Sequence, residues 1–205
     1  DANLWVDYVF LDTDERRRFA QLSHEYLIEQ LQFTGTDTMT SSTSADSMKP
    51  VRLNFNHPCK ELIWAVKKND TGTLIPFWNN FSTAKSLDAN TTANNYDNSS
   101  NPTMQAKIML NGNDRFATRK GDYFSLVQPY QHHENTPDVN HNGINVYSFA
   151  LKPEEHQPSG TLNMSRIDTA VLSLSSSVAG TIHVYAVNYN VLRILSGMGG
   201  LAYSN

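Results

Sequence analysis

Apolar and polar side chains alternate in several short stretches of the chain, which is the pattern of a half-buried β-strand. The alternation is strictest over residues 51–56, Val-Arg-Leu-Asn-Phe-Asn, and it recurs over residues 143–151. Runs rich in aromatic and β-branched residues predict further strands, at residues 3–11, 61–67, 106–110, 115–118, 170–174 and 181–195. The pattern therefore predicts a chain built mainly of strands.

Two pairs of these strands are separated by short turns, and we expect each pair to form an antiparallel hairpin. The first pair, 51–56 with 61–67, turns at His57-Pro58. The second pair, 106–110 with 115–118, turns at Asn111-Gly112, a dipeptide typical of two-residue hairpin loops.

The last 25 residues combine a long strand with a tail of small residues. Apolar side chains alternate at Ile182, Val184 and Ala186 and then resume one position out of phase over residues 187–191, as a β-bulge would produce. Residues 196–205 show neither a helical nor a strand period and supply no acid, base or nucleophile. We expect a strand that completes a sheet, followed by a tail that lies against the body or a neighbouring molecule.

Helical signals are few and short. Residues 12–21 predict a helix, since Asp12 or Thr13 can cap it, acids fill its first turn and basic residues follow. The arginine run over residues 16–18 is interpreted as a solvated helix face rather than a polyanion site. A second short helix is expected over residues 122–132.

Three polar or mixed segments separate these elements. Residues 25–34 fit a helix or a strand, and we favour the strand. Residues 34–47 are rich in Thr, Ser and Asp around a lone Met39, which predicts an exposed loop. Residues 69–103 form a long polar excursion, a length that is often functional in a compact domain.

These elements add up to an all-β fold of about seven or eight strands with long loops and little helix. Such a pattern predicts an antiparallel jelly-roll sandwich with short helices in its loops, rather than a parallel α/β fold.

Composition excludes several functional classes. The net charge of −4 over 205 residues argues against general nucleic-acid binding, which usually needs a basic surface. No apolar run approaches the roughly 20 residues that span a bilayer, and the chain opens without a signal peptide or an initiator Met, so we expect a fragment or a processed product. The single Cys59 excludes an internal disulfide and is interpreted as a buried thiol.

Common catalytic signatures are missing from the sequence, including the phosphate-binding loop, the G-x-S-x-G elbow and H-E-x-x-H. One histidine group could suggest a cupin-like metal site, at His132, His133 and His141 with Glu134 and Asp138. Cupin ligands lie on strands that face the barrel interior, whereas these residues fall in a Pro- and Asn-rich loop. We interpret them as solvated loop histidines and expect no metal, no other cofactor and no catalytic residue.

Five N-x-S/T sequons occur in the chain. A sequon requires an exposed loop and a glycosylating compartment, and Asn- and Ser-rich loops also generate it by chance. Four sequons lie in the polar excursion and are the candidate glycosylation sites, at Asn69, Asn80, Asn90 and Asn98. The fifth, at Asn163, lies near a predicted strand and is a weaker candidate.

Several stretches together resemble the major capsid proteins of large icosahedral nucleocytoplasmic DNA viruses, especially those of algae. The resemblance is carried in consistent order by residues 12–21, 24–35, 53–58, 110–121, 127–131, 147–153, 157–168 and the C-terminal segment. The Ser/Thr loop and the long excursion do not match.

The resemblance implies the C-terminal half of a double jelly-roll protein. Residues 1–24 would be the final strand of a preceding N-terminal jelly roll, over 3–11, with a linker helix, and residues 25–205 would be the C-terminal jelly-roll domain. In the segment 157–168, Pro158 and Gly160 would fix a turn that places Arg166 and Asp168 for an ion pair, either internal or between subunits.

The family comparison also implies a structural, non-enzymatic role. The chain would be a late virion glycoprotein of a double-stranded DNA virus, assembled in the host cytoplasm. It would form homotrimers of pseudo-hexagonal outline that tile an icosahedral shell. Its partners would be itself, neighbouring capsomers and minor capsid proteins, without direct nucleic-acid contact or membrane insertion.

Two alternatives remain open at the level of sequence. A jelly-roll carbohydrate-binding or attachment module would use aromatic residues in a groove, with Trp78, Phe81 and Tyr96 as candidates. A cupin-like metalloenzyme would use the histidine group and is disfavoured by its loop position.

Overall fold

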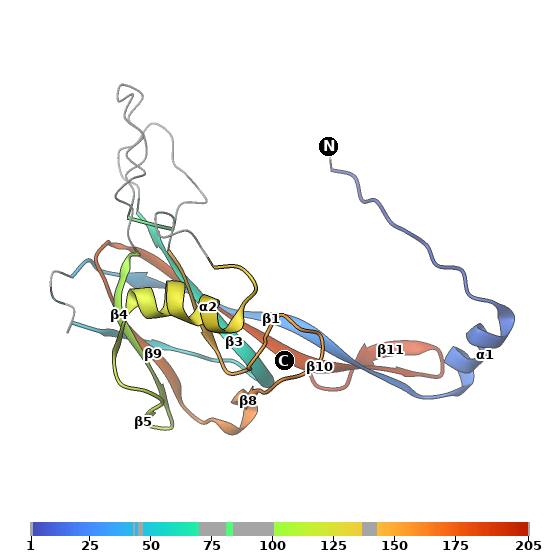
Figure 1. The fold of residues 1–205 in the computed structure, drawn as a ribbon. Coiled ribbons are helices and arrows are strands. Elements are labelled where there is room, and N and C mark those ends of the chain that lie inside the picture. The colour runs from blue at the N-terminus through green and yellow to red at the C-terminus, as the bar shows by residue number, and fades with distance from the viewer. Residues whose placement is uncertain are drawn as a thin grey trace. The chain divides into compact units, whose positions relative to one another are not determined.

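The computed structural model describes residues 2–42, 44, 47–69, 81–83, 101–136 and 143–204 (Figure 1). The chain divides into two compact units. The terminal unit comprises Asp1–Glu29 and Tyr189–Asn205, and the sandwich unit comprises Gln30–Asn188. Two 16-residue strands, β1 (His24–Met39) and β10 (Gly180–Leu195), each contribute residues to both units.

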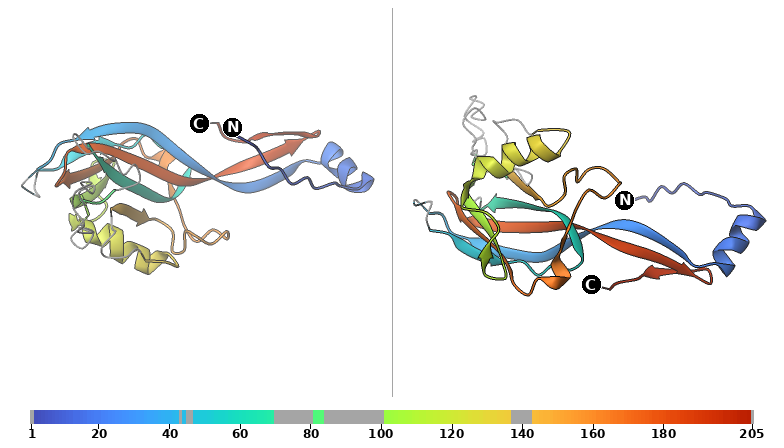
Figure 2. Two further views of the ribbon diagram at one scale, coloured as in Figure 1. Left: turned by 90° about the horizontal axis from the view of Figure 1, so that it is seen from above. Right: turned by 60° about the horizontal axis from the view of Figure 1, so that its bottom comes forward.

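The sandwich unit contains two antiparallel sheets, as expected for a jelly roll (Figures 1 and 2). The first sheet has the strand order β1-β10-β3-β7, with β8 paired to β3. Its further strands are β3 (Pro58–Lys68), β7 (Ile144–Ser148) and β8 (Leu162–Asn163). The second sheet has the order β2-β9-β4-β5, with β6 paired to β4. Its strands are β2 (Lys49–Arg52), β9 (Ala170–Ser176), β4 (Thr103–Leu110), β5 (Asn113–Asp114) and β6 (Arg119–Lys120).

The core lies between the two sheets. Alternate residues of β3 and β10 form its first wall, and alternate residues of β4 and β9 form the second, because successive side chains of a strand point to opposite faces. The fully or almost fully buried side chains include Leu62, Trp64, Val66, Ile108, Leu172, Leu174, Ile182 and Val184. The Phe124 ring closes the core, 5.0 Å from the ring of Trp64.

The expected short helix over 122–132 is confirmed. It consists of a π-helical turn at Tyr123–Val127 that continues into α2 (Gln128–His132). Its buried Gln128 accepts a hydrogen bond from the backbone N–H of Ser148 through Oε1, at 3.1 Å. This bond ties the helical segment to the last residue of β7.

The predicted hairpin between 51–56 and 61–67 is wrong. β2 pairs with β9 in the second sheet, whereas β3 pairs with β10 and β7 in the first. The intervening residues cross from one sheet to the other, and His57 adopts a left-handed φ of 66° at the crossing. The alternation of burial persists over 51–57, although the strand itself ends at Arg52.

For the second predicted hairpin, the turn at Asn111-Gly112 is confirmed. Asn111 and Gly112 have φ values of 50° and 80°, the positive pair that a type I′ turn needs. Leu110 pairs with Asn113 across this turn. Residues 115–118 form no strand, however, and β6 pairs with β4 further along instead.

Residues 25–34 are confirmed as a strand, and β1 extends beyond them to Met39. The expected exposed loop over 34–47 is therefore partly wrong. Met39 is buried at 4% exposure, because the strand carries it into the core of the sandwich. The composition of this segment did not predict the strand, because Thr, Ser and Asp are typical of loops, and packing in the sheet overrides such local preferences.

The predicted bulge in the last long strand is confirmed, but its consequence is different from the expected one. The register shifts where Val187 pairs with Glu61 and Asn188 with Cys59, so Lys60 of β3 is the extra residue. Val187 stays half-buried while Asn188 and Tyr189 are both buried, so the expected change of buried face is seen at Tyr189 but not at Val187. The Asn188 side chain donates to the carbonyl oxygen of Asn56 at 3.0 Å.

The terminal unit contains α1 (Thr13–Gln21) and a second hairpin. Asp12 caps α1 by accepting from the backbone N–H of Glu15 at 2.9 Å, as predicted. The tail is not without structure, because β11 (Met198–Leu201) pairs with residues 192–195 of β10. Ser196 and Gly197, with φ values of 53° and 77°, form the turn.

Residues 3–11 do not form the predicted strand. A strand needs a hydrogen-bonding neighbour, and none of the described strands pairs with this segment. The polar excursion predicted over 69–103 lies largely outside the described residues. Among the helices that are described, α1 has 9 residues and α2 has 5, and no helix is long and apolar enough to cross a membrane.

Candidate assembly surfaces

The two described histidines of the candidate metal group have separate partners. His132 Nδ1 lies 2.9 Å from the carbonyl oxygen of Leu151, and His133 Nε2 lies 2.8 Å from Glu61 Oε2. No three potential ligands gather anywhere in the described part of the chain. His141 and Asp138 fall outside it.

His133 is not a solvated loop residue, which corrects the sequence interpretation. Its side chain and that of Glu61 are 12% and 11% exposed. The pair joins the end of α2 to β3, and the next residue, Glu134, donates its backbone N–H to the carboxylate of Glu154 at 2.8 Å. His133 and Glu134 therefore have a structural role: His133 holds the end of α2 against β3, and Glu134 holds the loop that follows β7.

Cys59 is a buried thiol, as predicted. It is fully buried and donates through Sγ to the carbonyl oxygen of Glu61 at 3.2 Å. Burial raises the pKa of the Cys59 thiol to about 12. The reactive thiolate is therefore absent at neutral pH, and the thiol is no nucleophile.

The described sequons lie at the surface. Asn69 is exposed at the end of β3, and Asn163 is exposed and caps a short 3₁₀ turn by accepting from the backbone N–H of Ser165 at 3.1 Å. Asn80, Asn90 and Asn98 lie outside the described residues, as do Trp78 and Tyr96 of the carbohydrate-binding alternative. Phe81 is half-buried.

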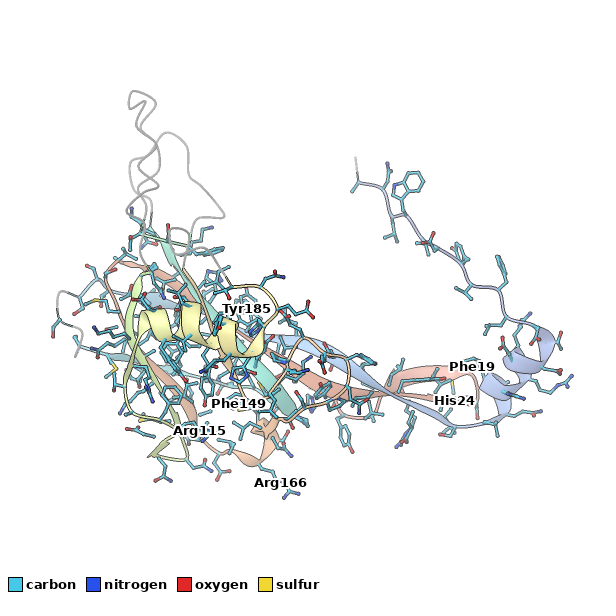
Figure 3. All side chains as sticks on the ribbon, viewed as in Figure 1. Phe19, His24, Arg115, Phe149, Arg166 and Tyr185 are labelled. Carbon is cyan, nitrogen blue, oxygen red and sulfur yellow. The ribbon has the colours of Figure 1, made fainter. Side chains whose placement is uncertain are left out.

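Arg166 and Asp168 are both exposed. No ion pair joins them within the described ranges, so the internal pair considered from the sequence does not form in the single chain. The Arg166 side chain points away from the ribbon (Figure 3).

The exposed apolar side chains gather in the terminal unit. Of the 20 large apolar side chains exposed among the described residues, 14 belong to this unit. They are Leu4, Trp5, Val6, Tyr8, Val9, Phe10, Leu11, Leu22, Tyr26, Leu27, Leu195, Met198, Leu201 and Tyr203. A soluble monomer rarely exposes so many large apolar side chains in one part of its chain, and such exposure is typical of a protein–protein interface.

The N-terminal arm, residues 2–12, is the most exposed part of this surface. Leu4, Trp5 and Phe10 are each at least 90% exposed. Every second side chain of an extended segment points the same way, so the arm presents apolar groups on both of its faces.

Alternate side chains of the C-terminal hairpin lie on opposite faces, and the face that carries Arg193 also carries the exposed Leu195 and Met198. Arg193 of β10 pairs with Glu25 of β1, with Nη2 2.6 Å from Oε1, on one face. The alternate positions Leu192 and Ile194 lie on the other face, opposite Leu201 and Gly199 of β11.

Specific contacts order this hairpin within its unit. The Asn190 side chain donates to the carbonyl oxygen of Tyr203 at 2.8 Å, and the N–H of Ala202 donates to the carbonyl of Val191 at 2.8 Å. The N–H of Gly197 donates to the carbonyl of Phe19 at 3.2 Å, which connects the turn to α1. The C-terminal tail is therefore an ordered part of the terminal unit, held by hydrogen bonds to β10 and α1.

The chain is similar to viral capsid proteins over almost its whole length. A family described as large eukaryotic DNA virus major capsid protein matches residues 15–200. The major capsid protein of Pyramimonas orientalis virus is 50% identical over 225 residues, which cover 100% of this chain and 49% of that protein. The major capsid protein of Paramecium bursaria Chlorella virus 1 is 48% identical, covering 99% of this chain and 54% of that protein. The chain therefore spans about half the length of these relatives.

Solved structures agree with the sequence comparison. The crystal structure of PBCV-1 VP54, fitted into a reconstruction of the virophage Sputnik, superimposes with a TM-score of 0.78 at 42% identity, over 97% of this chain and 56% of that one. The Faustovirus major capsid protein, at 14% identity and a TM-score of 0.60, shares the fold over 90% of this chain and 36% of that one. These similarities confirm the jelly-roll fold.

Proposed function

The chain belongs to the major capsid proteins of large eukaryotic DNA viruses, and we propose that it self-associates into pseudo-hexagonal trimeric capsomers that tile an icosahedral shell. The matching relatives are capsid proteins, so the chain is a structural protein and not an enzyme. Trimer formation, shell geometry and partners are our proposals for this chain.

One observation carries the proposal: the terminal unit exposes most of the large apolar side chains that are exposed at all. Burying apolar surface contributes about 25 cal/mol per Å². The hairpin, which leaves Leu195, Met198 and Leu201 exposed, therefore gains free energy when it packs against another chain, whereas the arm would pack against the preceding half of its own polypeptide. Closed symmetry repeats such a contact around a ring, which makes a weak contact sufficient for assembly.

We further propose that residues 1–24 are the final strand of a preceding jelly roll plus a linker helix, and that residues 25–205 form the C-terminal jelly-roll domain. The relatives are about twice as long as this chain. The N-terminal arm has the strand-forming composition but lacks a pairing partner among the described strands, as the last strand of a sheet made elsewhere would.

The remaining features follow the family proposal. The protein would reside in the virion after assembly in the host cytoplasm, in contact with neighbouring capsomers and minor capsid proteins and without direct nucleic-acid contact. Exposed sequons would accept glycans, with Asn69 the described member of the candidate set.

Light scattering coupled to size exclusion tests the proposal. We expect a stable trimer for the 205-residue chain, or for that chain joined to the remaining half found in its relatives. A monomer in both forms at micromolar concentration would contradict the proposal.

A further inference from the structure

The tight turn after β4 leaves a backbone nitrogen accessible directly after an asparagine side chain. Asn111 and Gly112 form this turn, and both residues are exposed. Gly112 has open surroundings, because a Cβ atom there would meet no heavy atom within 4 Å apart from its chain neighbours. Its N–H donates no hydrogen bond within the described part of the chain. This nitrogen is therefore free to react with the side chain that precedes it.

The side-chain amide of Asn111 is held and polarised by a backbone donor. The N–H of Thr169 donates to Asn111 Oδ1 at 3.1 Å, and the N–H of Asn111 donates to the carbonyl oxygen of Thr169 at 2.7 Å. A donor on a carbonyl oxygen stabilises the negative charge that develops there when a nucleophile attacks the carbon. The amide nitrogen Nδ2, the group that would leave, has no hydrogen bond to the described residues. The turn therefore combines an accessible nucleophile with an activated amide.

We propose that Asn111 is a site of spontaneous deamidation in the folded protein. The backbone nitrogen of Gly112 gives up its proton and forms a bond to Cγ of Asn111. The bond between Cγ and Nδ2 breaks, ammonia leaves with that proton, and a cyclic succinimide remains. Water then hydrolyses one of the two bonds between the ring nitrogen and a carbonyl carbon, which gives either aspartate or isoaspartate. Water is the sole co-reactant, and the step is neither an oxidation nor a reduction.

Asn163 is a matched comparison within the same chain. It is exposed, and its Oδ1 also accepts from a backbone N–H, that of Ser165, at 3.1 Å. The next residue is the buried Met164, whose N–H donates to the carbonyl oxygen of His57 at 3.0 Å. The nitrogen of Met164 is thus engaged in a hydrogen bond, whereas that of Gly112 is not. We expect the reaction at Asn111 and not at Asn163.

The products of the reaction would alter the turn. Leu110 pairs with Asn113 across it, and an isoaspartate lengthens the backbone between these two residues. The two hydrogen bonds between residue 111 and Thr169 would be weakened by that change. Either product also adds a negative charge to an exposed turn. Deamidation would therefore loosen the connection between β4 and the segment that leads into β9.

Incubation in water labelled with heavy oxygen tests the proposal. The unmodified 205-residue chain is kept in this water at mildly alkaline pH, then digested in ordinary water and mapped by mass spectrometry. Hydrolysis of the succinimide places labelled oxygen in the new carboxyl group, which excludes deamidation during digestion. We expect at least about tenfold more labelled product at Asn111 than at Asn163, which corresponds to about 1.4 kcal/mol in activation free energy. Isoaspartate should be present, because direct hydrolysis of the side-chain amide gives only aspartate.

Two controls define the result. Asn111→Gln keeps an amide but needs a larger ring, so the labelled product should vanish from this peptide; labelled product that persists would place the reaction at Asn113 and reject the site. Incubation in urea frees the N–H of Met164, so labelled product at Asn163 should rise. Equal labelled product at Asn111 and Asn163 in the native chain would overturn the proposal. Labelled product at Asn111 in urea but not in the native chain would also overturn it, because the folded turn would then protect the dipeptide.

Discussion

His133 and Glu61 are 72 positions apart in the chain and meet with Nε2 2.8 Å from Oε2, both side chains almost buried. The sequence suggested a metal ligand or a solvated residue at His133, and the structure uses it as a brace between α2 and β3. The other ring nitrogen, Nδ1, is buried without a hydrogen-bond partner among the described residues. The Glu61 contact is therefore the polar interaction that holds this imidazole.

Removing one partner of this pair is expected to destabilise the fold. Glu61→Ala leaves a buried imidazole with no acceptor, at a cost of about 1–3 kcal/mol in the free energy of unfolding. Urea denaturation of the purified chain measures this cost. Glu155→Gln, which breaks the exposed pair with Lys152, is the matched control, and we expect no measurable change from it. Equal effects of the two substitutions would contradict the structural role of His133.

The backbones of β10 and β3 approach closely at Gly180, and a larger residue there is expected to destabilise the sheet. A Cβ atom on Gly180 would collide with the carbonyl oxygen of Lys67 in β3, so Gly180→Ala must push the two central strands apart. Overpacking of this kind costs about 1–3 kcal/mol or more. Gly200→Ala in β11 meets open space and should cost less than about 0.5 kcal/mol. Thermal unfolding of both variants gives the comparison, and a tolerated Gly180→Ala would show that this part of the sheet is looser than described.

Strand positions could be predicted from the sequence because burial between two sheets imposes a period of two. This succeeded at Val51, Leu62 and Ile182, which all lie in the core. Sheet partners could not be predicted in the same way. β2 pairs with β9, which lies more than 100 positions later, and a short separation from β3 wrongly suggested a hairpin. No local signal specifies such a distant partner.

The assembly surfaces were predicted only in part. The exposure of Trp5, Tyr8 and Phe10 agrees with the prediction that residues 3–11 belong to a preceding jelly roll, because apolar residues of a strand without its neighbours are uncovered. The strand β11 was missed since Met-Gly-Gly-Leu has no strand period. Ser196-Gly197, a dipeptide typical of turns, was the available signal. The ring stack of Phe33 with His183 and Tyr185 was also missed, because these rings come from β1 and β10, whose pairing the sequence does not state.

The buried thiol predicts a pH dependence at the alkaline end. Burial raises the pKa of Cys59 from its ordinary value of 9.0 to about 12. The unfolded chain therefore releases this proton at lower pH than the folded chain does. The stabilising contribution is complete below pH 9.0 and is lost as the pH rises towards 12.

Two measurements check this expectation for Cys59. Between these pH values, the free energy of unfolding should fall less for Cys59→Ala than for the unsubstituted chain. The smaller alanine side chain lowers the stability of the variant by the same amount at every pH, so it does not affect this comparison. Thiol labelling of the native protein at pH 8 should be slow and should become rapid in urea. Rapid labelling of the native chain would place the thiol at the surface and contradict the buried site.

Deleting Ser196–Asn205 tests the C-terminal hairpin. The deletion removes β11 together with Tyr203, whose carbonyl accepts from the buried Asn190. It also removes Met198 and Leu201, two exposed apolar side chains of the terminal unit, so we expect trimer assembly to weaken. The core of the sandwich unit contains no residue from this tail, so its thermal transition should persist. Light scattering gives the mass and near-ultraviolet circular dichroism reports the packed aromatic core.

Gly200→Ala in the intact chain is the control for this deletion, because it alters β11 without removing the hairpin. An assembly role for the tail is supported if the truncated trimer dissociates at a higher protein concentration than the intact trimer while the near-ultraviolet circular dichroism of the core is unchanged. Loss of the core signal as well would mean that the tail serves folding. If the truncated chain forms trimers as stable as those of the intact chain, residues 196–205 do not contribute to assembly. The apolar side chains that stay exposed in the terminal unit, from Leu4 to Leu27 together with Leu195, must then act alone.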